Sequence, residues 1–416
     1  MRRLIVRLRN ADDVSTLSKR VGVDLTSVTS LEWVRGIPDL FGDTNSYRVK
    51  TSNRSQDSSW LDMRPYRWEG MPLYRSRKVF AHSKVVITTN LSTEELIEVF
   101  QQKITDKTKS IWYPKLDRRA LKGKLWKSKL PVKPRYPLYI ISKGRWEKCR
   151  TAHTLDFMGL DYRIVVEPSE EKQYREKWGK RVLVGDFDTT TNSSIPVRNW
   201  VNEHCQAEKY WLLDDNINYF YILNNNESWR CKTGAIFAMV EDYAARYKNV
   251  ALAGMNKLGF AKPTDRVAPY VLNTRVYSIT LMDKAMNEKI KIDGQLWRGR
   301  YNEDTDLNIR FLKAGYCTLN FQMFLGDKTT TQRCSGGNTD TVYVDGDRRL
   351  KFAQSLVDQH PDVVEVVEKW GRYHHKVDWG AFSDNALIRH ERVPIYDYKL
   401  YLGEYDDSTQ TSSRSC

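Results

Sequence analysis

Two acidic segments carry the residues of this chain that are best suited to chemistry. In the first, the adjacent carboxylates Asp214 and Asp215 follow the apolar run 210–213, and Asn216 comes next. Two neighbouring carboxylates repel each other unless a cation lies between them. Hard oxygen ligands of this type suit Mg²⁺ or Mn²⁺, which would bridge a bound diphosphate. An acidic cap at the end of a strand would contain the same residues, and this segment taken alone favours that simpler interpretation.

The second acidic segment, Asn302 to Asp306, precedes an expected helix whose apolar face begins at Leu307. Carboxylates at the start of a helix are stabilised by the helix dipole and need no function. The functional interpretation makes one of these carboxylates a general base, which would remove a proton from an attacking hydroxyl group.

A basic loop, Ser142-Lys143-Gly144-Arg145, closes the apolar segment that begins at Leu138. Gly144 allows the backbone to approach a ligand closely, and Lys143 and Arg145 can meet phosphate charge. The start of the helix that follows adds a favourable dipole for an anion. An ordinary turn with solvated cations is the alternative, but the position of the loop after a buried strand favours phosphate binding.

Strands and helices alternate from Pro137 onward, which predicts an α/β domain with a mostly parallel sheet covered on both faces. The expected strands are 138–142, 162–166, 182–184, 210–213, 250–253, 271–279 and 317–321. In such sheets, ligands bind at the carboxyl ends of the strands. The basic loop and the segment 214–216 both follow a strand directly, so the pattern places them on one edge of the sheet.

The first part of the chain, to residue 116, contains two similar units. The segments 4–8 and 85–87 are expected strands, and each precedes an expected helix. The second of these helices opens at Ser92 with a capping box. Two such β-α-β-like units predict a smaller α+β domain of ferredoxin-like type, which could help to position DNA.

Residues 117–136 form an expected basic linker in which Asp117 is the one acidic residue. Its candidate DNA-binding residues are Arg118, Arg119, Lys122, Lys124, Lys127 and Lys129. These side chains could form a strip for DNA phosphates, with neighbouring aromatic rings stacking on exposed bases, although a solvated linker is an equally good interpretation. The α/β domain would then extend over 137–403, and the Ser-, Thr- and Asp-rich tail 404–416 is expected to be disordered.

Composition limits the classes of function. The 416 residues carry a formal net charge of +15, which attracts polyanions such as nucleic acid, nucleotide-sugars or an anionic membrane surface. The six cysteines form no Cys-x-x-Cys pair, which argues against a disulfide scaffold and a structural zinc site and favours a reducing cytoplasm. Arg7 and Arg9 interrupt the apolar N-terminus, and no apolar run approaches the ~20 residues of a transmembrane helix, so neither secretion nor membrane insertion is expected.

Together, the motifs of residues 137–378 resemble those of GT-A-type nucleotide-sugar glycosyltransferases. These enzymes have a nucleotide-binding loop after the first strand, a D-x-D-like motif after a later strand, and a Glu-Asp motif that opens a helix. The strings YIISKGR from Tyr139, WLLDDN from Trp211 and NEDTDL from Asn302 look like those of the phage TET-associated glycosyltransferases. That family is linked to the decoration of hydroxymethylated or otherwise hydroxylated pyrimidines in phage DNA. The segment that ends in KTKSIWYP at Pro114 also looks like a leader found in other phage DNA-modification proteins.

The resemblance implies a Rossmann-like sheet, a UDP-sugar donor and a bound Mn²⁺ or Mg²⁺. The implied donor-binding residues are Ser142, Lys143, Gly144, Arg145, Asp214 and Asp215, and the implied metal ligands are Asp214, Asp215 and Asn216. Asp304 would be the catalytic base of an inverting displacement, with Glu303 beside it. Because Asn216 stands at the third D-x-D position and is a weaker, neutral ligand, the resemblance leaves open which carboxylate holds the metal.

The sequence therefore predicts an enzyme that transfers glucose, or a pentose such as arabinose, from a UDP-sugar to a pyrimidine base in phage DNA. The acceptor would be a hydroxylated or hydroxymethylated base such as 5-hydroxymethylcytosine. The reaction would occur in the host cell cytoplasm and protect the DNA from host nucleases. The alternatives are a glycosyltransferase with an acceptor other than DNA, a nucleotidyltransferase that makes activated sugars, and a basic DNA-binding protein whose acidic turns are structural.

Overall fold

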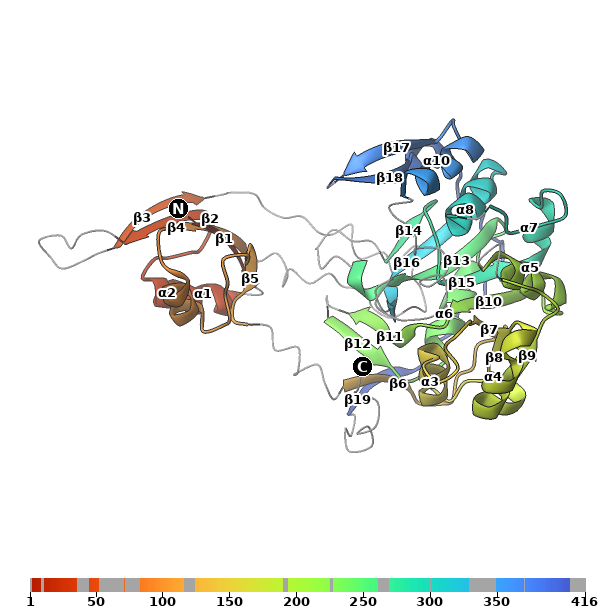
Figure 1. Cartoon of the computed structure of the whole chain (residues 1–416). Helices are drawn as coiled ribbons and strands as arrows, with labels where there is room; N and C mark the ends of the chain where they lie inside the picture. Colours follow the sequence, from red (N-terminus) through yellow and green to blue (C-terminus); the bar gives the residue numbers. More distant parts are fainter. Residues whose placement is uncertain are drawn as a thin grey trace, which may run out of the picture.

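A computed structural model describes residues 2–8, 11–35, 45–51, 71, 83–115, 124–189, 194–224, 227–260, 269–299, 301–328, 349–369 and 371–404 of the chain. Two main sheets organise these residues (Figure 1). A five-stranded sheet belongs to the N-terminal part, and a large sheet belongs to the rest. A separate two-stranded hairpin lies near the end of the chain.

The N-terminal sheet has the strand order β3-β2-β4-β1-β5, with β3 at one edge. Its elements are β1 (Arg2–Leu8), α1 (Ala11–Val21), β2 (Val28–Arg35), β3 (Asn45–Thr51), β4 (Ser83–Thr89), α2 (Thr93–Phe100) and β5 (Ser110–Trp112). Alternate residues of β1 are buried, and α1 buries Val14, Leu17 and Val21 at helical spacing, so both periodicities seen in the sequence are used. The predicted capping box at Ser92 is present at the start of α2.

Strand direction distinguishes this sheet from the simplest ferredoxin-like arrangement. The order β2-β4-β1-β5 interleaves the two predicted units, as expected. However, β1 and β5 are parallel neighbours, and so are β2 and β4, while β1 and β4 are antiparallel. The smaller domain is therefore an α+β domain with a mixed sheet.

The large sheet has the order β19-β6-β12-β11-β16-β13-β15-β10-β7-β8-β9, and β14 pairs with β16 beside this path. Its strands are β6 (Lys124–Ser128), β7 (Leu138–Ile141), β8 (Arg163–Val166), β9 (Val182–Val184), β10 (Lys209–Asp214), β11 (Ile217–Asn224), β12 (Glu227–Cys231), β13 (Val250–Lys257), β14 (Tyr270–Leu272), β15 (Ile279–Asp283), β16 (Cys317–Lys328) and β19 (Leu400–Glu404). The strands β7, β8, β9, β10, β13 and β16 all run in one direction, and β15 is an antiparallel strand among them. The carboxyl ends of these six strands therefore lie at the same edge of the sheet.

Helices cover both faces of the large sheet, which confirms the predicted α/β architecture (Figure 1). They are α3 (Arg150–Phe157), α4 (Glu171–Trp178), α5 (Ile195–His204), α6 (Ala235–Ala244), α7 (Lys284–Lys289) and α8 (Glu303–Lys313). Trp211 and Leu213 of β10 lie in a core shared with α3, α4 and α6, whereas Tyr210 and Leu212 lie in a core shared with α5 and α8. This alternation is the period of a strand that is buried on both sides.

The structure differs from the sequence prediction in the segment that follows residue 123. Residues 124–128 form β6, which pairs with β12 and β19, so they are part of the large sheet and not of a linker. Leu125 and Trp126 are buried there. The two apolar residues are adjacent and do not alternate with polar ones, and the lysines around them favoured the linker interpretation. The strand β19 ends at residue 404, where the tail was predicted to begin, and 405–416 lie outside the described residues.

A small unit near the end of the chain was not predicted. It consists of α10 (Arg349–Gln359) and the hairpin β17 (Val364–Lys369) and β18 (Arg372–Val377). Leu356 and Val364 of this unit share a buried cluster with Ile309 and Leu312 of α8. The unit therefore supports the helix that carries Glu303 and Asp304. Within the described part of the chain, no helix is long and apolar enough to cross a membrane.

Candidate active site

The carboxylates of Asp214 and Asp215 stand at the end of β10 and bind different partners. Asp214 accepts hydrogen bonds from Lys328 and from Arg198, the latter at 3.4 Å. Asp215 is buried and accepts from Ser142 Oγ at 2.7 Å and from Arg145 Nη1 at 2.6 Å. Successive residues of an extended chain point to opposite sides, so the pair divides between two groups of residues.

The first group is called the Asp215 cluster and consists of Ser142, Arg145, Tyr174 and Asp215. Parallel pairing places Asp214 opposite Ile141, so the basic loop begins beside the acidic pair. The Tyr174 hydroxyl lies 2.6 Å from Ser142 Oγ and accepts a hydrogen bond from the Arg145 backbone at 3.0 Å. Burial raises the pKa of Asp215, while Arg145 and Ser142 favour its charged form. The loop and Asp215, predicted to bind the donor together, are thus in direct contact.

Two carboxylates that follow β8 balance the rest of the basic loop. Lys143 Nζ donates to Glu167 at 3.1 Å, and the Gly144 N–H lies 2.8 and 2.9 Å from the two carboxylate oxygens of Glu170. Burial opposes ionisation of Glu167, but hydrogen bonds from Ser169, Thr189 and Lys143 lower its pKa to about 2. Sequence reasoning missed both glutamates, although their position directly after a buried strand was a usable signal.

The second group is called the Asp214 cluster and is built around Arg198 of α5. Arg198 Nη2 lies 3.4 Å from Asp214 Oδ1, and Arg198 Nε lies 3.7 Å from Glu303 Oε1. Ser194 also donates to Glu303 at 3.0 Å. One guanidinium group therefore joins the acidic end of β10 to the acidic start of α8. The full cluster consists of Arg198, Asp214, Lys257, Arg275, Glu303, Asp304 and Lys328.

Asp304 has the environment of a base that is ionised at neutral pH. Its Oδ2 lies 3.3 Å from Arg275 Nη2, and its Oδ1 accepts from the Thr305 backbone at 2.8 Å. Burial opposes ionisation, but Arg275 and Arg198 hold the pKa of Asp304 below its usual range. Burial raises the pKa of the neighbouring Glu303. The Asp304 side chain is still 19% exposed, so a substrate can reach it. Glu303 is almost equally exposed, at 18%, so the lower pKa is the property that favours Asp304 as the carboxylate already ionised to act as a base.

Three further cations complete the Asp214 cluster, and sequence reasoning missed all of them. Lys257 is the last residue of β13, and Lys328 is the last residue of β16. Arg275 precedes β15, and its guanidinium carbon lies 4.0 Å from the centre of the Tyr277 ring. Because β13 and β16 run parallel to β10, their ends reach the edge where Asp214 lies. A basic residue at the end of β13 and of β16 was a usable signal. It was missed because the predicted strands ended several residues before Lys257 and Lys328.

The predicted metal ligands do not converge on one point. The oxygens of Asp214 face Lys328 and Arg198, and those of Asp215 face Ser142 and Arg145. The buried Oδ1 of Asn216 has no partner among the described residues. In that part of the chain, no group of three His, Cys, Asp or Glu side chains could hold a metal ion. The described residues therefore do not form a metal cage.

Those candidate DNA-binding residues that the structure describes lie far from this site in the order of strands. Arg118, Arg119 and Lys122 are outside the described residues. Lys124 and Lys127 belong to β6, and Lys129 follows it as an exposed residue. In the sheet, β6 is separated from β16 by β12 and β11. The structure thus does not bring Lys127 and Lys129 to the Asp214 cluster.

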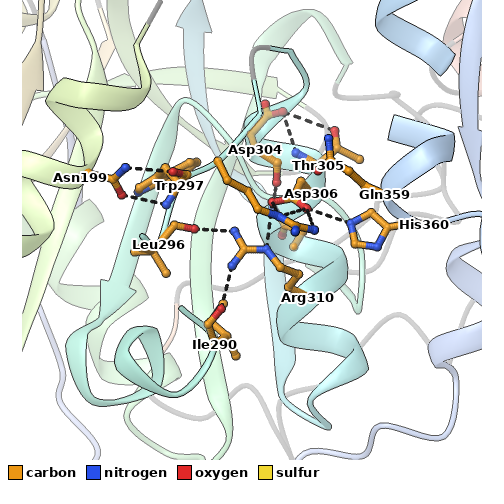
Figure 2. A network of polar contacts seen from close by, with 12 residues as sticks. Asn199, Ile290, Leu296, Trp297, Asp304, Thr305, Asp306, Arg310, Gln359 and His360 are labelled. Atoms are coloured by element: carbon orange, nitrogen blue, oxygen red, sulfur yellow. Dashed lines mark hydrogen bonds and ion pairs between the residues drawn. The ribbon is translucent and has the colours of Figure 1, made fainter. Parts of the chain in front are cut away.

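A buried ionic network lies just behind the start of α8 (Figure 2). Asp306 is fully buried and accepts hydrogen bonds from Arg298, from Arg310 at 2.9 Å and from His360 at 2.9 Å. Arg310 also donates to the backbone oxygens of Ile290 and Leu296. This Asp306 network ties α8 to α10 and to the loop before α8. It therefore fixes the position from which Glu303 and Asp304 project.

The region that contains this site is similar to a family of glycosyltransferases. Residues 136–337, just under half of the chain, match the model of the TET-associated glycosyltransferase family. The match includes the basic loop, both acidic segments and every residue of the Asp214 cluster. It confirms the resemblance predicted from the sequence.

Two solved structures show a more distant likeness. The crystal structure of S. aureus TarS 1-349 has a TM-score of 0.29 and 11% identity, covering 47% of this chain and 59% of that chain. The chain thus spans about three fifths of that structure. The inositol-1-phosphate CTP transferase from T. maritima has a TM-score of 0.29 and 9% identity, covering 50% of this chain and 94% of that chain. No curated protein sequence matches the chain closely enough to count as a relative.

Proposed function

We propose that this protein transfers a sugar from a UDP-sugar to the hydroxyl group of a hydroxylated or hydroxymethylated pyrimidine in DNA. The observation that carries the proposal is that Arg198 joins Asp214 to Glu303, next to Asp304, inside a region that matches a glycosyltransferase family. The sugar would be glucose or a pentose such as arabinose. In a phage, such a modification would protect the DNA from host nucleases.

The residues of the Asp214 cluster suit a single displacement at the sugar. The acceptor hydroxyl oxygen forms a bond to the anomeric carbon while the bond from that carbon to the diphosphate oxygen breaks. Asp304 accepts the hydroxyl proton, and the leaving diphosphate keeps the electron pair. One displacement inverts the anomeric configuration. Ser142 and Arg145, held against Asp215, lie at the same sheet edge and suit the nucleotide part of the donor.

Two features support a DNA base as the acceptor. The net charge of +15 attracts a polyanion. Phe260 follows β13, is 60% exposed, and has its ring centre 5.6 Å from Lys257 Nζ. An exposed aromatic ring next to the Asp214 cluster could stack on a base that has been flipped out of the duplex. An exposed acceptor hydroxyl on such a base would then approach Asp304.

Dependence on Mn²⁺ or Mg²⁺ stays a prediction. Such ions are commonly held by one or two carboxylates together with substrate phosphates. Asp214 is the carboxylate of the predicted set that faces Glu303 and Asp304 through Arg198. To bind an ion that arrives with the donor, Asp214 would have to give up Lys328 or Arg198 as a partner.

The proposal is tested by turnover of the full chain with a panel of UDP-sugars. The acceptors are DNA with 5-hydroxymethylcytosine and DNA with plain cytosine, each with Mn²⁺ and with a chelator, and the digested nucleosides are weighed by mass spectrometry. We expect a hexose- or pentose-sized gain on the hydroxymethylated nucleoside alone. No gain with any donor, despite tight DNA binding, would contradict the proposal and favour a binding protein. Pyrophosphate release from a nucleoside triphosphate and a sugar phosphate would instead indicate a nucleotidyltransferase.

A further inference from the structure

Lys257 is a half-buried cation that forms no ion pair with a described carboxylate. Its Nζ lies 4.1 Å from the centre of the Tyr277 ring and 5.6 Å from the centre of the Phe260 ring. No described carboxylate lies within ion-pairing distance of it, whereas Arg198, Arg275 and Lys328 each have one. An aromatic face attracts a cation but does not neutralise its charge.

The Asp214 cluster has more cations than carboxylates. Its four cations are Arg198, Lys257, Arg275 and Lys328, and its three carboxylates are Asp214, Glu303 and Asp304, so the balance is 4 − 3 = +1. Burial and the neighbouring Lys328 lower the pKa of Lys257 to about 8, and Asp214 and Asp304, which lie beyond ion-pairing distance, offset this only in part. A bound anion would favour the charged ammonium group further.

We infer that Lys257, together with Arg275 and Lys328, binds the diphosphate of the donor and stabilises it as the leaving group. This inference rests on the proposed function and deepens it. All three cations stand at or near strand ends beside Asp214, at the edge where the basic loop would hold the nucleotide. When the bond from the anomeric carbon breaks, its electron pair goes to the diphosphate, which gains one negative charge. A cation already in place at that point favours the transition state over the ground state.

The test is a comparison of three ligands by calorimetry with the full chain. Inorganic pyrophosphate and UDP carry the charge that Lys257 would meet, whereas uridine does not. Because a hydrogen bond to a charged group contributes about 1.5–3 kcal/mol, K257Q should bind pyrophosphate and UDP at least about tenfold more weakly than the unaltered chain. Uridine affinity and the unfolding temperature should be unchanged, and K257R should recover part of the loss. The matched control is K289Q, an exposed lysine in the last turn of α7, which should leave all three affinities unchanged.

The outcomes separate this inference from the proposed function. If sugar transfer occurs and K257Q binds UDP and turns over like the unaltered chain, the inference is wrong and the proposed function stands. If no donor is turned over but pyrophosphate binding depends on Lys257, the anion site is supported and the proposed function alone falls. A loss of uridine binding equal to the loss of UDP binding would show a general structural defect, and K257R would then fail to restore either; that result would overturn the inference.

Discussion

Asp304 and Asp306 lie two residues apart at the start of α8, but they occupy two regions with opposite properties. Asp304 faces the Asp214 cluster, is 19% exposed and has one arginine partner. Asp306 is fully buried, and Arg298, Arg310 and His360 surround it (Figure 2). Two residues correspond to about 200° of rotation along a helix, so the two carboxylates project from opposite faces. The face of the helix, and not the residue type, decides which carboxylate is available to a substrate.

The difference shows how one short acidic segment can provide both a carboxylate open to a substrate and a carboxylate that holds the helix in place. A carboxylate with an open side can accept a proton from a substrate, whereas a carboxylate whose oxygens are filled cannot. The Asp306 network instead holds the helix at a fixed position against α10 and the preceding loop. Asp304 is the carboxylate that the proposed function uses as a base, and Asp306 helps to hold the helix in place.

The largest expected effect comes from Asp304→Asn, which keeps the shape of the side chain but removes the base. Turnover should fall by about 10²- to 10⁴-fold, since that is the usual contribution of a general base. UDP affinity and the free energy of unfolding should change little. Turnover is measured by the nucleoside mass assay, and binding by calorimetry. Unchanged turnover would remove Asp304 from its proposed role.

Asp306→Asn should reduce the free energy of unfolding strongly and turnover only weakly. It leaves Arg310 and Arg298 without their carboxylate, and breaking a buried ion pair costs about 3–5 kcal/mol. Urea unfolding at pH 7 should show this loss, while turnover per folded molecule should fall much less than in the Asp304 variant. Equal losses of turnover in the two variants would show that Asp304 and Asp306 do not have different roles.

The pH dependence of the Asp306 effect has a defined sign. Burial opposes ionisation of Asp306, but His360 and Arg298 hold its pKa below its usual range. A carboxylate with a lowered pKa stabilises the fold fully above its unfolded pKa of about 3.9, and the contribution is lost as the pH falls. The difference in unfolding free energy between the unaltered chain and Asp306→Asn should therefore shrink below about pH 4.

Arg198→Lys should have an intermediate effect. Lysine keeps the charge but cannot bridge Asp214 and Glu303 with separate nitrogens, nor present a flat guanidinium to Trp297. The loss of a charged hydrogen bond predicts a fall in turnover of about tenfold or more. The Asp306 network should be intact, so urea unfolding should change by less than in Asp306→Asn. A turnover equal to that of the unaltered chain would show that the bridge has no role in positioning.

The smallest expected effect is that of Phe260→Ala. Stacking of a base on an aromatic ring contributes about 1–3 kcal/mol, and the exposure of this ring favours the lower end of that range. The KM for DNA should rise roughly fivefold, with kcat and UDP affinity nearly unchanged. A fall in kcat at constant KM would argue against an acceptor role for Phe260.

Short-range patterns predicted much of this molecule. The apolar run 210–213 marks a strand buried on both faces, and the acidic pair after it marks the carboxyl end of that strand. The same reasoning predicted the basic loop after β7 and the helix that starts at Glu303. These features depend on residues close together in the chain, where alternation and capping are visible. The strand β6 was not predicted because lysines flank its two apolar residues.

What the sequence by itself determined is which residues stand at the ends of strands and at the start of α8. The tertiary structure decided how these residues pair. Arg198 meets Asp214 and Glu303, and Lys328 meets Asp214 from another strand, over sequence separations that no local pattern reports. It also decided that Asp214 and Asp215 face different clusters and that Lys257 forms no ion pair with a carboxylate in the described part of the chain. The reason is physical: periodicity follows from the local backbone, whereas the partner of a charge is set by the order in which distant strands pack.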